Sequence, residues 1–118
     1  MDKEKREVKR IVDELLARLS SKGIEINKLI LFGSRVRAET GPFSDWDVAV
    51  VSKSFNRIGL LRRQELLGEA IWQMTYPVEI LGYSLKEYEK ASRESFLSTI
   101  RASGQIVYEK GDVVHSIQ

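Results

Sequence analysis

The sequence predicts one α/β domain, in which a small mixed β-sheet is packed against helices. The chain has 118 residues, enough to bury one hydrophobic core and too few for a second independent one. Short apolar runs typical of buried strands alternate with longer stretches whose apolar residues recur at helical spacing. We therefore predict a single domain over 1–118, with an N-terminal helix at about 3–22, a core at about 24–108 and a flexible tail over 109–118.

An amphipathic helix is the first predicted element. Its apolar face is formed by Val8, Ile11, Val12, Leu15, Leu16 and Leu19, and Gly23 follows as a natural stop. The apolar run Lys28–Phe32 predicts a strand, after which a short helix is expected over 34–38 and a loop over 39–44. Trp46–Ser52 is rich in valine and predicts a second strand. Because so little chain joins these strands, we expect them to pair antiparallel.

The second half of the chain continues the alternation. Its predicted elements are a helix over 58–74, a strand over 78–82, a helical pattern up to about 103 and a strand over 105–108. Asn56 is a candidate N-cap for the first of these helices, and Pro77 ends that segment. Ser84 and Glu87 match a capping box, which predicts a helix start directly after Ser84. Gly104 fits the residue that ends a helix.

Composition excludes several classes of protein. The chain has no cysteine, which excludes disulfides and thiolate chemistry, and its only histidine, His115, excludes a multi-histidine metal site. The 19 basic and 17 acidic residues are intermixed, so no direct binding of nucleic acid is expected. No apolar run approaches the roughly 20 residues that span a bilayer, and no signal peptide is evident. We expect a cytoplasmic protein without a membrane anchor.

Two aspartates flank a tryptophan at the start of the second predicted strand. Alternate residues of a strand point to the same face, so the carboxylates of Asp45 and Asp47 should lie side by side. Two like charges held together favour a cation between them. With no histidine or cysteine nearby, oxygen ligands predict a hard ion, Mg²⁺ or Mn²⁺.

Two further features extend this candidate site. Glu79 is a lone carboxylate in an apolar strand, and it would join the two aspartates if its strand lies beside theirs. The turn Gly33-Ser34 follows a strand end, where free backbone amides and a hydroxyl suit an anion. Arg35 and Arg37 add cations that suit phosphate oxygens. Three carboxylates opposite a phosphate cradle predict phosphoryl or nucleotidyl transfer.

Structural explanations compete with the functional ones. Glu79 would also suit an edge strand facing solvent, and Arg37 could form only a surface ion pair. Arg35 and the pair Arg62-Arg63 are expected to be solvated, although the pair could also form a docking patch. Trp46 is expected to point into the core, away from its flanking aspartates.

The stretch from Phe32 to Val50 resembles the polymerase-β-like nucleotidyltransferase superfamily. That signature is Gly-Ser, ten residues and Asp-x-Asp, and the chain has Gly33-Ser34, ten residues and Asp45-Trp46-Asp47. The segment FGSRVRAETGPFSDWDVAVV is more narrowly similar to the minimal nucleotidyltransferase (MNT) group, whose members usually have the pattern F-G-S-x-A-R-G…S-D-x-D-L-x-V. The chain departs from that pattern at Val36 and at Ala38, where the group has alanine and glycine.

The resemblance implies a role for each matching residue. Gly33 and Ser34 would hold the triphosphate, and Ser44 occupies the motif's serine directly before the aspartates. Asp45 and Asp47 would bind the catalytic metals, with Glu79 in the place of the usual third aspartate. Arg37 matches the family's arginine, near the phosphates or supporting the loop. The implied cofactor is Mg²⁺ or Mn²⁺, and the implied substrate is ATP.

The resemblance also implies a partner. MNT proteins are often encoded beside a HEPN-domain RNase toxin and act as its antitoxin, in studied cases by moving AMP from ATP to a tyrosine of the toxin. The alternative is a binding module that neutralises its partner by complex formation, with a weak or vestigial nucleotide site. Both hypotheses allow a homo-oligomer or a hetero-oligomer. Nucleic-acid polymerisation is disfavoured because the chain has no room for a template-binding domain.

Overall fold

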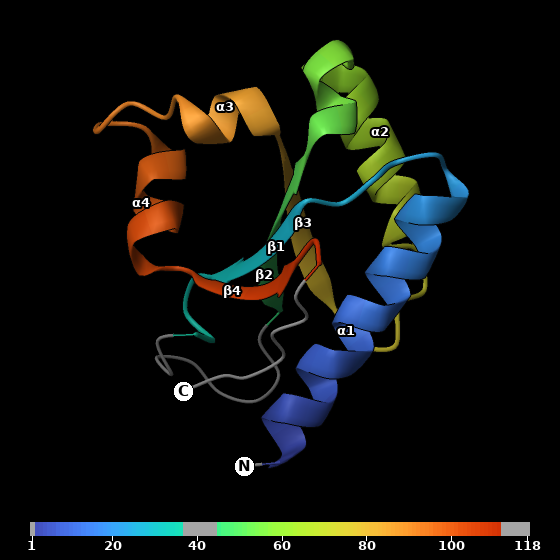
Figure 1. Cartoon of the computed structure of the whole chain (residues 1–118). Helices are drawn as coiled ribbons and strands as arrows, with labels where there is room; N and C mark the ends of the chain where they lie inside the picture. The colour runs from blue at the N-terminus through green and yellow to red at the C-terminus, as the bar shows by residue number, and fades with distance from the viewer. Residues whose placement is uncertain (1, 37–44, 112–118) are drawn as a thin grey trace.

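The computed structural model describes residues 2–36 and 45–111 and contains a four-stranded sheet with helices on both faces (Figure 1). In chain order the elements are α1 (Asp2–Ser21), β1 (Lys28–Phe32), β2 (Trp46–Ser52), the 3₁₀ helix η1 (Lys53–Arg57), α2 (Leu60–Ala70), β3 (Val78–Ser84), α3 (Leu85–Glu89), α4 (Phe96–Ser103) and β4 (Gln105–Glu109). The predicted class, a mixed sheet packed against helices, is confirmed.

The strands lie in the order β3-β2-β1-β4. β1 runs antiparallel to β2 and to β4, whereas β2 and β3 run parallel. The antiparallel first pair is therefore confirmed. η1 and α2 supply the crossover that a parallel pair needs. In the resulting register, Asp47 of β2 lies directly beside Glu79 of β3.

The sheet separates two hydrophobic layers. Figure 1 shows α1 and α2 on one face of the sheet and α3 and α4 on the other. Leu31 and Val48 belong to the larger layer under α1 and α2, and Val51 belongs to the smaller layer, which includes Ile100 of α4. Because successive residues of a strand point to opposite faces, β1 and β2 contribute to both layers.

The predicted apolar face of α1 is buried against the sheet. Val8, Ile11, Val12, Leu15 and Leu19 are at most 1% exposed, and each such burial contributes about 1.5–3 kcal/mol. Gly23 follows the helix with a φ of 78°, a left-handed conformation that glycine adopts without strain. No helix in the described ranges has the length and apolar character to cross a bilayer.

The helix predicted over 58–74 is shorter than expected, and its capping prediction is wrong. α2 ends at Ala70 because the guanidinium of Arg18 binds the carbonyl oxygens of Ala70, Trp72 and Gln73, which lie at and beyond the helix end. Gly59 occupies its N-cap position, while the Asn56 side chain accepts a hydrogen bond from the Lys86 amide. The segment that holds Asn56, between β2 and α2, forms the 3₁₀ helix η1.

The capping box at Ser84 is confirmed, and it starts the first of two separate helices. The Glu87 amide donates to Ser84 Oγ at 3.0 Å, and the Ser84 amide donates to Glu87 Oε1 at 2.7 Å. α3 then ends at Glu89, and α4 has its own cap, Ser95. Gly104 ends α4, as predicted, and does so with a φ of −78° rather than in a left-handed conformation. Glycine is needed there because a Cβ would lie 2.5 Å from the Ile100 carbonyl oxygen.

Two other expectations, the exposure of Arg62-Arg63 and the start of the C-terminal tail, are corrected. Arg62 is exposed as expected, but Arg63 is buried. Its guanidinium donates to the carbonyl oxygens of Ile58 and Phe55 and to the Glu87 carboxylate, at 2.8 Å. The predicted tail begins too early, because β4 extends through Glu109.

Glu87→Gln is expected to reduce stability by about 1 kcal/mol at pH 7, because glutamine keeps the cap and loses the charge beside Arg63. Burial tends to raise the Glu87 pKa, but hydrogen bonds from Ser84 and Arg63 outweigh it and lower the pKa. The carboxylate is 44% exposed, which limits the effect. Because the Glu87 pKa is lower in the folded state than in the unfolded state, where it is about 4.3, the charged carboxylate stabilises the fold above pH 4.3. This stabilisation is lost as the pH falls through the folded-state pKa.

Urea unfolding of both proteins at pH 7 and at pH 3 checks this prediction. The stability difference between wild type and Glu87→Gln should shrink at the lower pH. The exposed Glu89→Gln, on the same helix, is the matched control. A difference of equal size at both pH values would contradict the assigned ion pair.

Candidate active site

A cavity of about 490 Å³ lies between one end of the sheet and α4. β1 and the turn after it contribute Phe32, Gly33 and Ser34 to its lining. β2 and β3 contribute the carboxylates of Asp47 and Glu79. This cavity, called the acid pocket below, therefore brings together four of the residues that the sequence predicts.

The two carboxylates of the acid pocket come from neighbouring parallel strands. Asp47 and Glu79 are register partners, so their side chains leave the same face of the sheet. Trp46 points to the opposite face and is 1% exposed, which confirms its expected place in the core. The hypothesis that the Glu79 strand lies beside the aspartate strand is also confirmed. Neighbouring strands are about 4.8 Å apart, close enough for two carboxylates to share a cation.

Gly33 lies directly against the Asp47 carboxylate. Its φ is 82°, and a Cβ at this position would lie 2.0 Å from Asp47 Oδ2. The contact arises because Phe32, the last residue of β1, pairs with Asp47 in the antiparallel ladder. The Gly-Ser turn therefore starts beside the acid, and only glycine fits both the backbone conformation and the space.

The other predicted site residues are placed differently. Asp45 directly precedes β2, is exposed and does not line the acid pocket. Arg37 and Ser44 lie outside the described residues, and so does Ala38. Of the helix expected over 34–38, residues 34–36 are described, and they form a turn. Within 2–36 and 45–111, no three acidic or histidine side chains gather closely enough to hold a metal ion. The structure thus unites two of the three predicted acids, and the role of Asp45 stays a prediction.

Three buried side chains link α1 to both halves of the site, and this link was not predicted, although the core position of Trp46 was. The Arg35 guanidinium lies over the Trp46 ring, 4.1 Å from its centroid, and 3.4 Å from Glu7 Oε1. The Trp46 indole donates to the same Glu7 oxygen at 3.0 Å. Arg35 is therefore not solvated as expected, since its side chain is 9% exposed. Glu7 lies four residues before Ile11, and this helical spacing already places it on the buried face of α1.

Glu7 connects the chain segments that carry the acid pocket. Arg35 follows the Gly33-Ser34 turn, and Trp46 precedes Asp47. A single buried carboxylate on α1 binds both, which holds the turn and the aspartate strand in one arrangement. These three residues act through others and are positioning residues.

Glu7→Ala is expected to lower the free energy of unfolding by about 3 kcal/mol. The change removes one partner of a buried ion pair and leaves the Trp46 indole without its acceptor. Urea unfolding measures the loss, with Glu4→Ala as the control because Glu4 is exposed on the same helix. A loss no larger than that of the control would show that the pair does not stabilise the fold.

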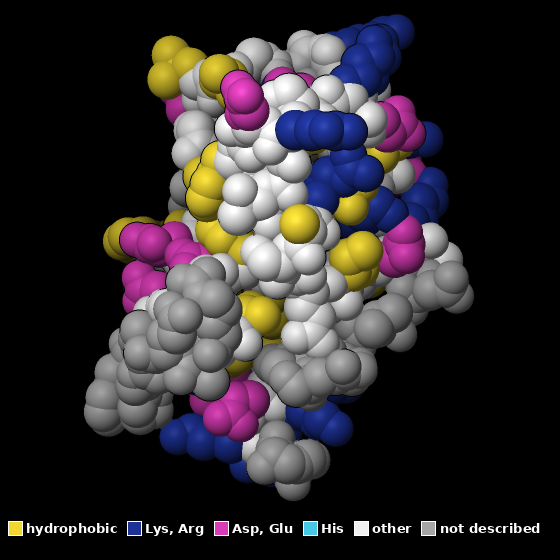
Figure 2. Space-filling model, turned by 90° about the vertical axis from the view of Figure 1, so that its left-hand side faces the viewer, with side chains coloured by type: hydrophobic (Ala, Val, Ile, Leu, Met, Phe, Trp, Pro, Cys, Tyr) yellow, Lys and Arg dark blue, Asp and Glu magenta, His cyan; other side chains and the backbone are white. Residues whose placement is uncertain are grey.

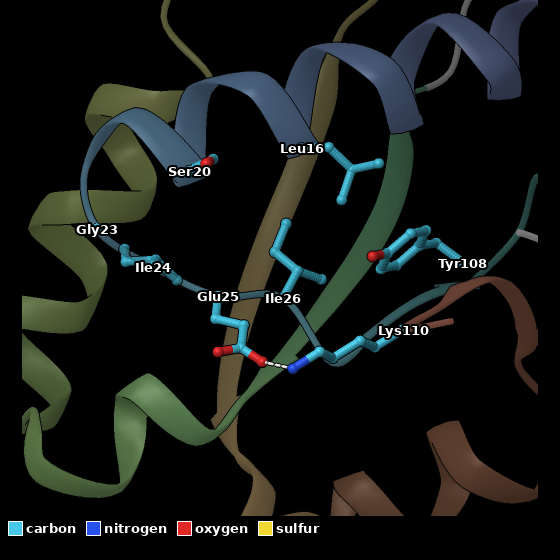
Figure 3. A pocket seen from close by; sticks show the side chains of 8 residues that line it. All are labelled: Leu16, Ser20, Gly23, Ile24, Glu25, Ile26, Tyr108 and Lys110. Carbon is cyan, nitrogen blue, oxygen red and sulfur yellow. Dashed lines mark hydrogen bonds and ion pairs between the residues drawn. The ribbon is translucent and has the colours of Figure 1, made fainter. Parts of the chain in front are cut away.

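A second cavity, of about 510 Å³, lies at the far end of α1 (Figure 3). Leu16, Ile24 and Tyr108 make much of its lining apolar. Among the described residues that line it, the one carboxylate is Glu25, which is paired with Lys110. The hydrogen bond from Lys110 lowers the Glu25 pKa. A single carboxylate in this cavity lacks the two-carboxylate ligand set of the acid pocket, so the acid pocket is the candidate active site.

The donor chemistry of the acid pocket fits a hard divalent cation. Asp47 and Glu79 offer carboxylate oxygens, and Ser34, Thr99 and Ser103 bring hydroxyl groups to the same cavity. Oxygen ligands without histidine or cysteine suit Mg²⁺ or Mn²⁺. The two hydroxyl residues of α4 were not predicted, because nothing in the sequence brings α4 to the cavity that Asp47 and Glu79 line.

Comparison with known proteins agrees with this geometry. The family model for the nucleotidyltransferase domain matches residues 8–107. The chain belongs to the nucleotidyltransferase domain family. The matched residues of this nucleotidyltransferase domain include the buried stripe of α1, the Gly-Ser turn, both aspartates and the start of β4. The predicted superfamily is therefore confirmed.

The fold of this nucleotidyltransferase domain also has a counterpart among solved structures. An inferred nucleotidyltransferase from Sulfolobus solfataricus superposes with a TM-score of 0.68 at 16% sequence identity. The match covers 96% of this chain and 89% of that chain. At such low identity the likeness concerns the fold. No match was found among the curated proteins.

Proposed function

We propose that this nucleotidyltransferase domain moves a nucleoside monophosphate, AMP from ATP, onto a hydroxyl group of a protein. The observation that carries the proposal is the pairing of Asp47 and Glu79 beside the Gly33-Ser34 turn in one cavity. The resemblance of Phe32–Val50 to the MNT group supports a protein acceptor. By the same resemblance, the acceptor is a HEPN-domain toxin encoded by an adjacent gene, and this protein is its antitoxin.

The residues of the acid pocket divide the work of the transfer. The acceptor oxygen attacks the α-phosphorus of ATP, the bond from that phosphorus to the bridging oxygen of the β-phosphate breaks, and pyrophosphate leaves. Glu79 takes the proton of the acceptor hydroxyl, while the amides of the turn and the Ser34 hydroxyl donate to phosphate oxygens. Asp47 and Glu79, with Asp45 as a further predicted ligand, would hold Mg²⁺ or Mn²⁺, which would supply charge neutralisation at the phosphates when bound.

The experiment uses ATP that is labelled at the α-phosphate, Mg²⁺ and the protein encoded by the adjacent gene. We expect label on that protein, and no label when the γ-phosphate is labelled instead, because AMP rather than phosphate is transferred. Asp47→Asn should abolish the labelling. If wild type and Asp47→Asn alike leave the partner unlabelled, the proposed transfer is wrong.

A second candidate function is a binding module that neutralises its partner by complex formation. The observation that favours it is that Asp45 lies outside the acid pocket, so the described residues contain no cluster of three acids. This candidate expects Asp45→Asn/Asp47→Asn to protect cells from the partner as well as wild type does. Loss of protection in a folded double variant would exclude it.

A further inference from the structure

An apolar groove of about 530 Å³ lies beside the acid pocket on the face that carries α3 and α4. Leu60 of α2, Tyr83 of β3 and Phe96 of α4 line it. Leu60 is 69% exposed and Phe96 is 57% exposed, which is unusual for such large apolar side chains. Figure 2 shows this face, where hydrophobic side chains reach the surface and Lys and Arg side chains gather on one side.

The groove adjoins the acid pocket at Phe96. This residue lines both cavities. Its ring packs edge-on against Phe32, with the centroids 5.7 Å apart, and Phe32 is the register partner of Asp47. A chain segment seated in the groove would therefore lie next to the acid pocket.

The polar groups at the groove favour an acidic occupant. Lys86 and Lys90 line it and are exposed, and neither ammonium forms an ion pair within the part of the chain that the structure describes. The one carboxylate among the described lining residues, Glu87, is held by Arg63. Tyr83 adds a hydroxyl that can donate a hydrogen bond at neutral pH, as any tyrosine does.

We propose that this groove binds the acceptor protein of the transfer reaction, through a segment with a large apolar side chain flanked by Asp or Glu residues. The apolar side chain lies against Leu60 and Phe96, and the acidic residues lie beside Lys86 and Lys90. The acceptor hydroxyl then enters the acid pocket past Phe96. The catalytic part of this inference rests on the proposed function, whereas binding in the groove does not.

A second copy of this chain is a poorer occupant. In a two-fold symmetric dimer the same patch meets itself. Lys86 and Lys90 would then face the same lysines of the other copy, and like charges at an interface oppose association. A heterologous acidic segment satisfies both the apolar lining and the lysines.

The test selects peptides from a phage-displayed random library on the immobilised full-length chain, without ATP or Mg²⁺. We expect enrichment of peptides that combine Phe, Trp, Tyr or Leu with Asp or Glu. Their affinity should fall about tenfold or more for Leu60→Asp and for Lys86→Glu/Lys90→Glu. Leu61→Asp is the matched control, because Leu61 is 78% exposed on the same helix but does not line the groove. The affinity of Leu61→Asp for the selected peptides should match that of wild type.

Three results would overturn the inference. The first is that wild type enriches peptides no more than Leu60→Asp does, and the second is that basic peptides are enriched. The third is that wild type self-associates and that Leu60→Asp removes this self-association. ATP-dependent labelling of the partner is measured separately with the same variants, where Lys86→Glu/Lys90→Glu should raise KM for the partner and leave kcat unchanged. If labelling fails while peptide binding is intact, the proposed function is rejected and the groove remains a binding site for an acidic segment.

Discussion

Asp47→Asn is expected to lower the rate of nucleotidyl transfer about a thousandfold. The substitution removes one of the two carboxylates that line the acid pocket, with almost no change in size. Neutralising the phosphate charge during transfer is worth several kcal/mol, and about 4 kcal/mol corresponds to a thousandfold change in rate. Transfer of label from α-labelled ATP to the partner, followed over time, gives the rate.

The fold should tolerate the same substitution. Asparagine removes a negative charge next to Glu79, so we expect the free energy of unfolding to change by less than about 1 kcal/mol. Asp13→Asn is the matched control for activity, because Asp13 is exposed on α1. A rate for Asp47→Asn near that of Asp13→Asn would remove Asp47 from the catalytic machinery.

Gly33→Ala is expected to lower the free energy of unfolding by about 3 kcal/mol and to abolish nucleotide binding. Alanine at a φ of 82° costs about 1–2 kcal/mol. Its Cβ would also lie 2.0 Å from Asp47 Oδ2 and 3.2 Å from Asp47 Cβ, so the aspartate must move, at a further cost of about 1–3 kcal/mol. Urea unfolding and ATP binding are the two measurements.

Two comparisons separate the causes of this loss. Gly23→Ala has a similar φ, 78°, and nothing within 4 Å of its Cβ, so it should show only the backbone cost. In an Asp47→Ala background, Gly33→Ala should cost less than in wild type, because the contacts with the carboxylate are gone and only the 3.2 Å contact with the Cβ of residue 47 remains. Equal losses in the presence and absence of the Asp47 carboxylate would mean that the turn does not pack against it.

Local patterns predict the strands and the first helix well. Lys28–Phe32 and Trp46–Ser52 form the expected strands with the expected bounds, because each is a short apolar run with turn residues on at least one side. The stripe of α1 is buried for the same local reason. The pairing of Asp47 with Glu79 needs one further step, the parallel register of β2 and β3, which spacing along the chain does not contain.

Features that depend on distant side chains were missed. The burial of Arg35 requires Glu7 from α1 and the Trp46 ring, and the burial of Arg63 requires Glu87 and several carbonyl oxygens. A charged residue read alone is expected to be solvated, because burying a charge without partners is costly. The partners come from elements far apart in sequence. The end of α2 was misplaced for the same reason, since Arg18 lies on another helix.

Binding of ATP in the presence of Mg²⁺, measured by isothermal titration calorimetry, tests the central claim most directly, because it needs no acceptor. If the acid pocket is a metal–nucleotide site, wild type binds ATP only with Mg²⁺ or Mn²⁺ present, and Asp47→Asn and Glu79→Gln each weaken binding while the proteins stay folded. If wild type shows no Mg²⁺-dependent binding of ATP, or if Asp47→Asn binds as tightly as wild type, the claim is contradicted.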